Sequence, residues 1–504
     1  MSSPLSARSI SCLEKSTGKV RPNQRSKFAA FEQQWGVGTG EASGRVSNGA
    51  GFGGPEDSLN LNATIEAVLP YLFPVLFALV IVAVLPLIAG YIVLVERKVM
   101  ADMQVRLGPM RVGPHGLLQP IADAVKLLLK EDIIPESADK VIFWGAPLIS
   151  VTAAMLALSA LPIGPFFQIA DLNIGLLFVL GISSLGIFGI VLGGWASNSH
   201  YSLLGALRSA AQLVSYETSA GMAVVGTLLL AGTLSTRGIV ETQADHGMWF
   251  IFAAPVGFFI YLVASIAETN RAPFDMPEAE SELVAGYMTE YSGFRWALYF
   301  LAEYTNMIVV SSIATTLFLG GWLRPFAGTA LFNFLDFFPT LMMLLIAGYC
   351  FYRAPKQPVA VQKMFMVAVG LLCGLLALIL LVPLVTPSGS LLASAKPGLH
   401  GAFWFLFKVS AYIYTFMWLR FTFPRYRFDQ LMRLGWQFLV PLSIVNVAGI
   451  GIGLTLHREL GWPAAPSLLL TIVMTLGVAA YLISVGEKHE PVIVGEEGEG
   501  AADA

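Results

Sequence analysis

Eleven stretches of mostly apolar residues run along the chain, and each is long enough to cross a bilayer as a helix of about 20 residues. They lie near residues 70–95, 141–163, 174–196, 211–233, 248–267, 297–320, 333–352, 363–386, 402–423, 436–456 and 465–485. Polar residues gather in the connections, and no segment remains that could form a sizeable soluble domain. The pattern predicts an all-α polytopic membrane protein with about 11 transmembrane helices.

One further segment, residues 117–131, has the period of a helix but is too short to cross a bilayer. Its apolar positions are Leu117, Ile121, Val125 and Leu128. The charged residues Asp123, Lys126 and Lys130 fall elsewhere on the helix. We expect this segment to lie at the membrane interface or against the bundle.

The two ends of the chain differ from the rest. Residues 1–60 are polar and rich in Ser and Gly, without the continuous apolar run of a secretory signal, so we expect a disordered N-terminal extension. Residues 487–504 form an acidic tail that we expect to be solvated.

Composition supports the membrane prediction and narrows the chemistry. The chain is 56% hydrophobic and 12% charged, whereas soluble domains are about 25% charged. A net charge of −3 gives no reason to propose a nucleic-acid partner. The three cysteines form no CxxC, and no GxxxxGK[ST] or strand-borne GxGxxG is present. We therefore expect Fe–S clusters, zinc, nucleotide and flavin to bind elsewhere if they take part.

Basic residues are distributed unequally between the two sets of loops. Loops after spans 1, 3, 5, 7 and 9, with the terminus after span 11, hold 18 Lys and Arg. The opposite loops hold four, which are Arg237, Arg324, Lys396 and Arg458. The positive-inside rule places the first set in the cytoplasm.

The loop after the first span combines charges with a fixed turn. Glu96, Arg97 and Lys98 end the span, and two Gly-Pro pairs follow within residues 108–114, which excludes a helix there. The basic pair could simply reach the lipid headgroups. The accompanying charges at Glu96, Arg106, Asp123 and Lys126 favour a buried polar cavity instead.

The loop after the fifth span is crowded with acids. Its carboxylates are Glu268, Asp275, Glu278, Glu280, Glu282 and Glu290, balanced by Arg271 and Arg295. Asp275 followed by Glu278 fits a helix N-cap with its capping box, so the acids could stabilise a helix start and face water. Crowded carboxylates near a low dielectric would instead suit proton uptake and relay.

Other charges interrupt the spans or end them. These residues are Arg208, Glu217, Glu303 and Lys408. A charge at the bilayer centre costs at least about 2.5–3.5 kcal/mol, so such residues either pair within the bundle or form a chain for ions. The last basic loop contains Arg420 and Arg425, which an ordinary positive-inside cluster would also explain.

Five segments together resemble a known family. They are residues 96–98 with 106–131, 194–217, 267–293, 302–307 and 420–442, in that order. They look like the signature segments of the H subunit of NADH-quinone oxidoreductase (respiratory complex I), the bacterial counterpart of mitochondrial complex I subunit 1. The resemblance covers roughly residues 65–325 and 400–456.

The resemblance implies a division of the chain. It gives a core of eight helices within residues 65–325 and 400–456, an inserted helix pair at 326–399, and an extra C-terminal span at 457–486. Two inserted spans preserve the sides of all later loops.

The resemblance also implies a function, as the membrane component of a proton-translocating NADH:quinone oxidoreductase that is not active alone. The implied quinone-chamber residues are Arg97, Arg106, Asp123, Lys126, Phe274, Arg420 and Arg425. The implied proton-relay residues are Arg208, Glu217, Glu268, Arg271, Asp275, Glu278, Glu280, Glu282, Glu290 and Glu303. No catalytic or metal-binding residue is implied in this chain.

The substrate implied is a quinone, either ubiquinone or menaquinone, and nothing is bound covalently. FMN and Fe–S clusters are expected only in partner subunits. Those partners are the Fe–S quinone-module subunits of the peripheral arm and the small and antiporter-like membrane subunits. The implied location is the bacterial inner membrane.

Two other functions compete with this one. The homologous membrane component of a membrane-bound hydrogenase or formate hydrogenlyase would need no quinone, and the complete first-loop segment favours the quinone enzyme. A separate secondary transporter predicts inverted repeats around a midplane site. No internal repeat is visible, and the charges cluster on one side.

Overall fold

The structure is a computed structural model that describes residues 61–275, 285–386, 395–461 and 464–487. The predicted N-terminal extension at 1–60 and the predicted acidic tail at 487–504, apart from Glu487, therefore lie outside the described residues. The chain divides into two units, residues 1–66 and 67–504, and every helix from Ala67 onward belongs to the second. All regular secondary structure in the described ranges is helical, which confirms the predicted fold class.

The longer helices are α2 (Leu61–Met103), α4 (Lys140–Leu158), α5 (Gly175–Ala196), α6 (His200–Ala231), α9 (Pro255–Glu268), α11 (Gly293–Leu317), α12 (Phe338–Arg353), α13 (Ala360–Val385), α15 (Lys396–Thr422), α17 (Val440–Glu459) and α18 (Ala464–Glu487). The shorter ones are η1 (Pro114–Gly116), α3 (Gln119–Leu129), α7 (Thr236–His246), α8 (Phe250–Ala253), η2 (Gly286–Met288), η3 (Ala330–Phe337), η4 (Ala354–Lys356), α16 (Phe428–Arg433) and the π-helix η5 (Leu434–Leu439).

Within the described residues, nine helices are long and apolar enough to cross a membrane. Two shorter apolar helices, Pro255–Glu268 and Thr471–Leu482, fall at the fifth and eleventh predicted spans. The fifth span is divided because Pro255 has no N–H to donate, and α8 ends before it while α9 begins on it.

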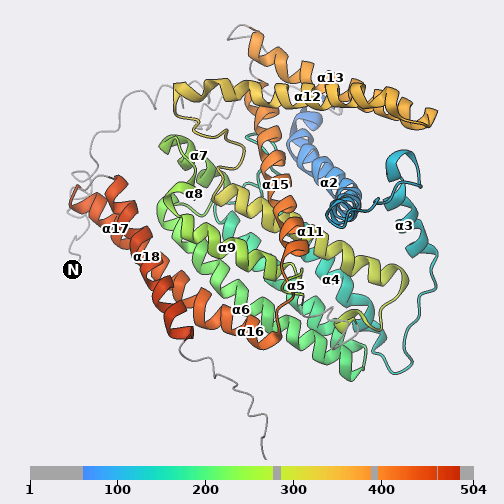
Figure 1. Ribbon diagram of the computed structural model, residues 1–504, viewed down its shortest axis with the longest axis horizontal. Coiled ribbons are helices and arrows are strands. Elements are labelled where there is room, and N and C mark those ends of the chain that lie inside the picture. The colour runs from blue at the N-terminus through green and yellow to red at the C-terminus, as the bar shows by residue number, and fades with distance from the viewer. Residues whose placement is uncertain (1–60, 276–284, 387–394, 462–463, 488–504) are drawn as a thin grey trace, which may run out of the picture. The chain divides into compact units, whose positions relative to one another are not determined.

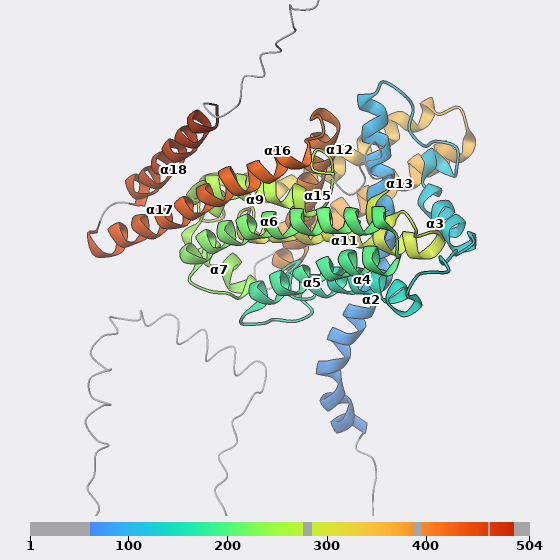
Figure 2. The same cartoon turned by 90° about the horizontal axis from the view of Figure 1, so that it is seen from below.

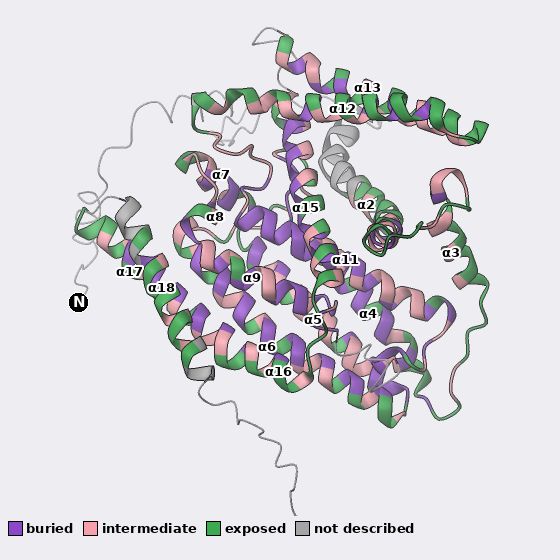
Figure 3. Cartoon of the chain, viewed as in Figure 1, coloured by how far each residue is buried: buried purple, intermediate pink, exposed green. Residues whose placement is uncertain are grey.

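Helices α6 and α11 form the centre of the bundle. In Figure 2, α4 and α5 lie on one side of α6 and α17 lies on the other. Figure 1 shows α9 beside α6, and Figure 3 shows the buried positions concentrated on α6, α9, α11 and α15. Of the most apolar stretch of α11, 61% is buried, against 17% in α13. The core is therefore central, and α13 presents mainly an apolar outer surface.

A glycine permits a close approach between α4 and α5. A Cβ atom on Gly189 of α5 would lie 2.1 Å from Ser150 Oγ and 2.9 Å from the Ala146 carbonyl oxygen of α4. No larger side chain fits between these backbones without a shift. The α4–α5 pair consequently holds the polar side chains near Ser150 close to α6.

Lys408 of α15 fixes the loop that follows α11. Its side chain is buried, and its ammonium donates to the carbonyl oxygens of Leu319 at 2.6 Å, Gly321 at 2.9 Å and Leu323 at 2.5 Å. It also lies over the Trp249 ring, 4.3 Å from its centroid. All three protons of the ammonium have acceptors, so this buried charge has the structural role of pairing within the bundle.

The first loop, which we define as residues 104–118, follows α2. As the Gly-Pro pairs predict, no α-helix forms there, and the chain turns through positive φ at Gly113, His115 and Gly116. A Cβ on Gly116 would lie 2.1 Å from the Pro109 carbonyl oxygen. The loop is therefore a closely packed turn.

Replacing Gly116 with alanine should deform the first loop, because a side chain meets both the contact with Pro109 and an unfavourable φ of +77°. We expect the variant to lose about 1–3 kcal/mol of loop stability, seen as faster protease cleavage within residues 104–118 in membranes. Gly145→Ala is the matched control, since nothing lies within 4 Å of its Cβ position. Equal cleavage rates in the two variants would contradict the packing described here.

Helix α3 matches the predicted amphipathic segment, with bounds two residues shorter at each end. None of its residues is buried, and Ile121, Val125 and Leu128 are exposed on its apolar face. In this chain alone that face has no cover, as expected for a helix that meets lipid or another subunit.

Helices α12 and α13 pack against each other at the predicted insertion. Asp336 before α12 pairs with Arg324 Nη1 at 3.3 Å and with Lys396 Nζ at 2.8 Å. At the other end, α13 contacts η1 of the first loop. The inserted pair is thus joined to the bundle at both ends.

Candidate functional site

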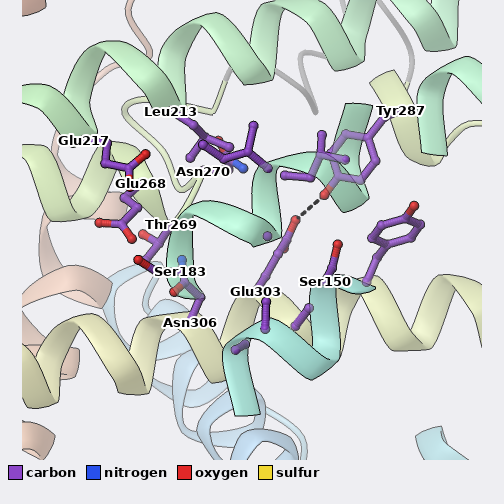
Figure 4. Close-up of a pocket in the computed structure, with 17 residues that line it drawn as sticks. Ser150, Ser183, Leu213, Glu217, Glu268, Thr269, Asn270, Tyr287, Glu303 and Asn306 are labelled. Carbon is purple, nitrogen blue, oxygen red and sulfur yellow. Dashed lines mark hydrogen bonds between the residues drawn. The ribbon is translucent and has the colours of Figure 1, made fainter. Parts of the chain in front are cut away.

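A small polar cavity of about 70 Å³ lies between α4, α5, α6, α9 and α11. Three carboxylates line it, Glu217 from α6, Glu268 from the end of α9 and Glu303 from α11. Figure 4 shows Glu217 and Glu268 together at one end and Glu303 further along. The cavity is large enough for water, and the polar residues Ser183, Thr269, Asn270 and Asn306 line it together with the three acids.

Each end of this acidic cavity has its own hydrogen bonds. At one end, Ser184 Oγ donates to Glu217 Oε1. At the other, the Tyr287 hydroxyl donates to Glu303 Oε1 at 3.1 Å, drawn as a dashed line in Figure 4. Arg271 Nη2 lies 3.4 Å from Glu303 Oε2, and both side chains are nearly buried.

Arg271 also faces a second group of charges, which we name the Glu96 cluster: Glu96, Tyr304 and Arg420. Its guanidinium carbon lies 4.3 Å from the centroid of the Tyr304 ring. The Tyr304 hydroxyl donates to Glu96 Oε2 at 2.5 Å, and Arg420 Nη1 pairs with Glu96 Oε1. Helices α2, α11 and α15 thus bring their charges together, and Arg271 connects the cluster to Glu303.

Three outer ion pairs are formed by residues close in sequence to the Glu96 cluster or to the acidic loop. Arg97 Nη1 lies 2.9 Å from Asp123 Oδ2, and Lys126 Nζ lies 3.4 Å from Asp123 Oδ1. Arg425 Nη2 lies 3.1 Å from the buried Asp275 carboxylate. These contacts join the end of α2 to α3, and the loop after α15 to the acidic loop.

Phe274 joins the same region through its ring. It is buried, and it stacks on Tyr426 with 5.6 Å between ring centroids. Gln212 Nε2 of α6 donates to the Phe274 carbonyl oxygen at 2.7 Å and to that of Ala267 at 2.8 Å. The start of the acidic loop is therefore held firmly against α6.

An apolar cleft of about 760 Å³ lies between α2 and α15, with α11 and α12 contributing. On α2 its lining extends from Val80 to Val95, the residue before Glu96. On α15 it extends from Phe405 to Met417, one turn before Arg420. The cleft consequently ends beside the Glu96 cluster.

Not every predicted site residue joins these groups. Glu278, Glu280 and Glu282, and the predicted cap between Asp275 and Glu278, fall among residues 276–284 and lie outside the described residues. Glu290 does not line the acidic cavity. Nor does Arg208, whose guanidinium lies over the Phe428 ring at 5.7 Å.

Two predicted residues have surroundings that differ from their expected group. Asp275 contacts Arg425, an expected chamber residue, whereas the resemblance implies a relay role for it. Arg106 is exposed and donates to Gln104 at 2.7 Å. Within the described ranges, no group of three or more His, Cys, Asp or Glu could hold a metal ion.

The sequence does not predict Tyr287, Tyr304 and Asn306 as site residues. It places Glu96 among the charges at the end of the first span but does not predict it as a chamber or relay residue. A tyrosine resembles any other aromatic residue of a span, and only folding reveals which hydroxyl meets a carboxylate. Tyr304 and Asn306 do offer one signal, because both lie within one turn of the intramembrane Glu303.

Comparisons with known proteins agree with one another. A family model described as NADH dehydrogenase matches residues 75–451. One NADH-quinone oxidoreductase H subunit of Solibacter usitatus is 55% identical over 384 residues, which cover 75% of this chain and 95% of the relative. An H subunit of Koribacter versatilis is 49% identical, covering 74% and 89%. The H subunit of Rickettsia felis is 42% identical, covering 75% and 94%.

Proposed function

Because the chain belongs to the family of NADH-quinone oxidoreductase H subunits, membrane components of the multi-subunit respiratory complex I, we propose that it forms the quinone chamber and the start of the proton path. The chamber is bounded by the Glu96 cluster with Arg97, Asp123 and Arg425. The proton path begins at Glu303, whose carboxylate is paired with the permanently charged Arg271, and continues through Glu268 and Glu217. The related hydrogenase subunits are not favoured by these comparisons.

One observation carries the chamber proposal: an apolar cleft that ends beside a buried group of charges. A quinone has a long isoprenoid tail and a polar head, so its site needs hydrocarbon surroundings that lead to hydrogen-bonding groups. The cleft along α2 and α15 supplies the first. The Glu96 cluster supplies the second at its end.

Reduction of a quinone to quinol consumes two electrons and two protons. In the proposed scheme the electrons arrive from an Fe–S cluster of a peripheral-arm subunit, with FMN further upstream in another partner. Arg271 lies between Glu303 and the Glu96 cluster and contacts both Glu303 and the Tyr304 ring. The charge of Glu303 can therefore respond to a change at the quinone and pass to the next acid of the cavity.

The proposed orientation follows the loops. The basic loops after α2, α9 and α15 face the cytoplasm of a bacterium, where the peripheral arm docks, and the spans lie in its inner membrane. The proton path leads toward the antiporter-like membrane subunits, whereas the exposed apolar face of α3 and the Fe–S quinone-module subunits of the peripheral arm complete the surroundings of the chamber. Whether the substrate is ubiquinone or menaquinone depends on groups shared with those subunits.

A tryptophan at Ile88 tests the chamber proposal. Ile88 lines the cleft, so the larger ring should obstruct a long isoprenoid tail. We expect KM for a ten-isoprene quinone to rise about tenfold, while KM for a short-tailed quinone rises much less. The measurement is NADH:quinone reductase activity of the assembled complex in proteoliposomes.

The neighbouring residue offers a matched control. Leu87 is exposed on α2 but does not line the cleft, so Leu87→Trp should leave both KM values unchanged. An equal effect of Ile88→Trp on long and short tails, or the same effect from Leu87→Trp, would refute the tail-binding role of the cleft.

A further inference from the structure

A third pocket lies where α13 of the inserted helix pair meets α2 and the first loop. It has a volume of about 270 Å³. Lys98, Asp102 and His115 line it from the side of α2 and the first loop, and Phe365 and Met366 line it from α13. The His115 and Phe365 rings approach to 6.5 Å between centroids. One wall is thus polar, and the other is the apolar start of the inserted helix.

Positive charge converges on this pocket. Lys98 Nζ donates to the His115 carbonyl oxygen at 2.7 Å. Burial lowers the pKa of His115, and the positive charges of Lys98 and Arg353 lower it further. Asp102 is the acid of the lining, and Lys98 with Arg353 outweighs it. The pocket therefore has one cation in its lining, Lys98, and a second close enough to act on His115, Arg353, against one acid.

One polar atom of the lining residues has no protein partner. His115 Nε2 is buried and makes no hydrogen bond within the described part of the chain. A buried polar atom without a partner is costly unless a water or ligand completes its bonding. The atom belongs to a residue of the pocket wall, so the missing partner would lie in the pocket.

We propose that this pocket binds the phosphate headgroup of an anionic phospholipid, held by Lys98 and His115 with Arg353 adding positive charge nearby, and that its acyl chains lie along α13. The pocket lies at the loop end of the spans, where lipid headgroups are found. From the pocket, α13 continues with the exposed Leu371, Leu372 and Leu375. Basic pockets between transmembrane helices bind such headgroups. The site is separate from the chamber and does not depend on the proposed function.

A free phosphate ion or an acidic peptide would meet the same charges, but neither would cover the apolar side of the site. Phe365 and Met366 border the pocket, and the outward surface beyond them is hydrocarbon-like. Desolvating that surface favours a ligand with tails, at about 0.8 kcal/mol for each buried CH₂. The observations therefore favour a lipid over the other two.

The test uses the complete complex carrying Arg353→Gln, placed in nanodiscs of phosphatidylcholine with increasing phosphatidylglycerol. Phosphatidylglycerol retained after detergent washing is counted by mass spectrometry. We expect half-maximal retention at about a fivefold higher phosphatidylglycerol fraction than in the wild type, and one fewer lipid retained per complex. Arg353→Lys, which keeps the charge, should restore retention in large part.

Arg433→Gln is the matched control, because Arg433 is also an exposed basic residue after a span but lies in α16, away from α13. It should retain lipid like the wild type. Equal retention in Arg353→Gln and the wild type would overturn the proposal. So would full displacement of the lipid by inorganic phosphate, or loss of a protein subunit in place of lipid from the Arg353→Gln complex.

Discussion

Replacing Arg271 with methionine should lower NADH:quinone reductase activity of the assembled complex at least about tenfold. Methionine keeps the apolar stem but removes the guanidinium from between Glu303 and Tyr304. Removing one partner of a buried ion pair costs about 3–5 kcal/mol, because the other charge is left without its counter-ion. Both the Glu303 carboxylate and the hydrogen bond from Tyr304 to Glu96 would change their geometry.

Two measurements separate this effect from misassembly. NADH oxidation by an artificial acceptor uses only the peripheral arm, so we expect it to remain near the wild-type rate. Arg237→Met removes a guanidinium that pairs with Glu241 on the surface at 2.9 Å, and it should leave both activities unchanged. Quinone reductase activity above half of the wild-type value in Arg271→Met would rule out the connecting role of Arg271.

Replacing Lys408 with methionine should lower the free energy of unfolding by about 3 kcal/mol or more. The substitution conserves length and apolar volume but leaves the carbonyl oxygens of Leu319, Gly321 and Leu323 without the ammonium. Each buried acceptor left unsatisfied costs about 1–3 kcal/mol. The loop between α11 and η3 should then detach from α15, and the melting temperature of the complex in detergent should fall.

Lys356 provides the comparison for Lys408. It is exposed, with its ammonium 3.6 Å from the centroid of the Tyr352 ring, so Lys356→Met should change the melting temperature little. If the Lys408→Met complex had the same melting temperature as the Lys356→Met complex and the wild type, the three carbonyl contacts would contribute nothing measurable to stability.

Hydrophobic length located the predicted spans, because a bilayer requires about 20 apolar residues in each of them, whereas the short α3 was predicted from its helical period and the polar α7 was not predicted. The boundaries were less predictable. Helix α2 begins at Leu61, well before the apolar stretch expected from residue 70, since helix formation continues where hydropathy falls. Pro255 divides the fifth span, although the apolar run through it is continuous in the sequence. An apolar run in the sequence indicates that a segment lies in the bilayer. The residue at which the helix begins depends on backbone hydrogen bonding, which the apolar run does not reveal.

The site was predictable as a set of charges but not as a set of pairs. Arg271 was visible as the cation that balances an acidic loop, yet its contact with the Tyr304 ring depends on how α9 meets α11. The same holds for Asp275 and Arg425, which are 150 positions apart. Residues so far apart in the sequence show no spacing pattern that would predict their contact, so the contact is known only once the packing of the helices is known.

Arg271 lies against two groups at once and carries a single positive charge, so the two cannot respond independently. Adding a proton to Glu303 changes the field at Tyr304 and Glu96, and a ligand at the Glu96 cluster changes the field at Glu303. Thermodynamic reciprocity makes these effects equal. If a quinone headgroup bound at the Glu96 cluster changes the proton affinity of Glu303 by some factor, a proton on Glu303 changes the affinity for the quinone by the same factor. A titration of quinone affinity against pH would therefore also measure the coupling free energy between the proposed chamber and the acidic cavity.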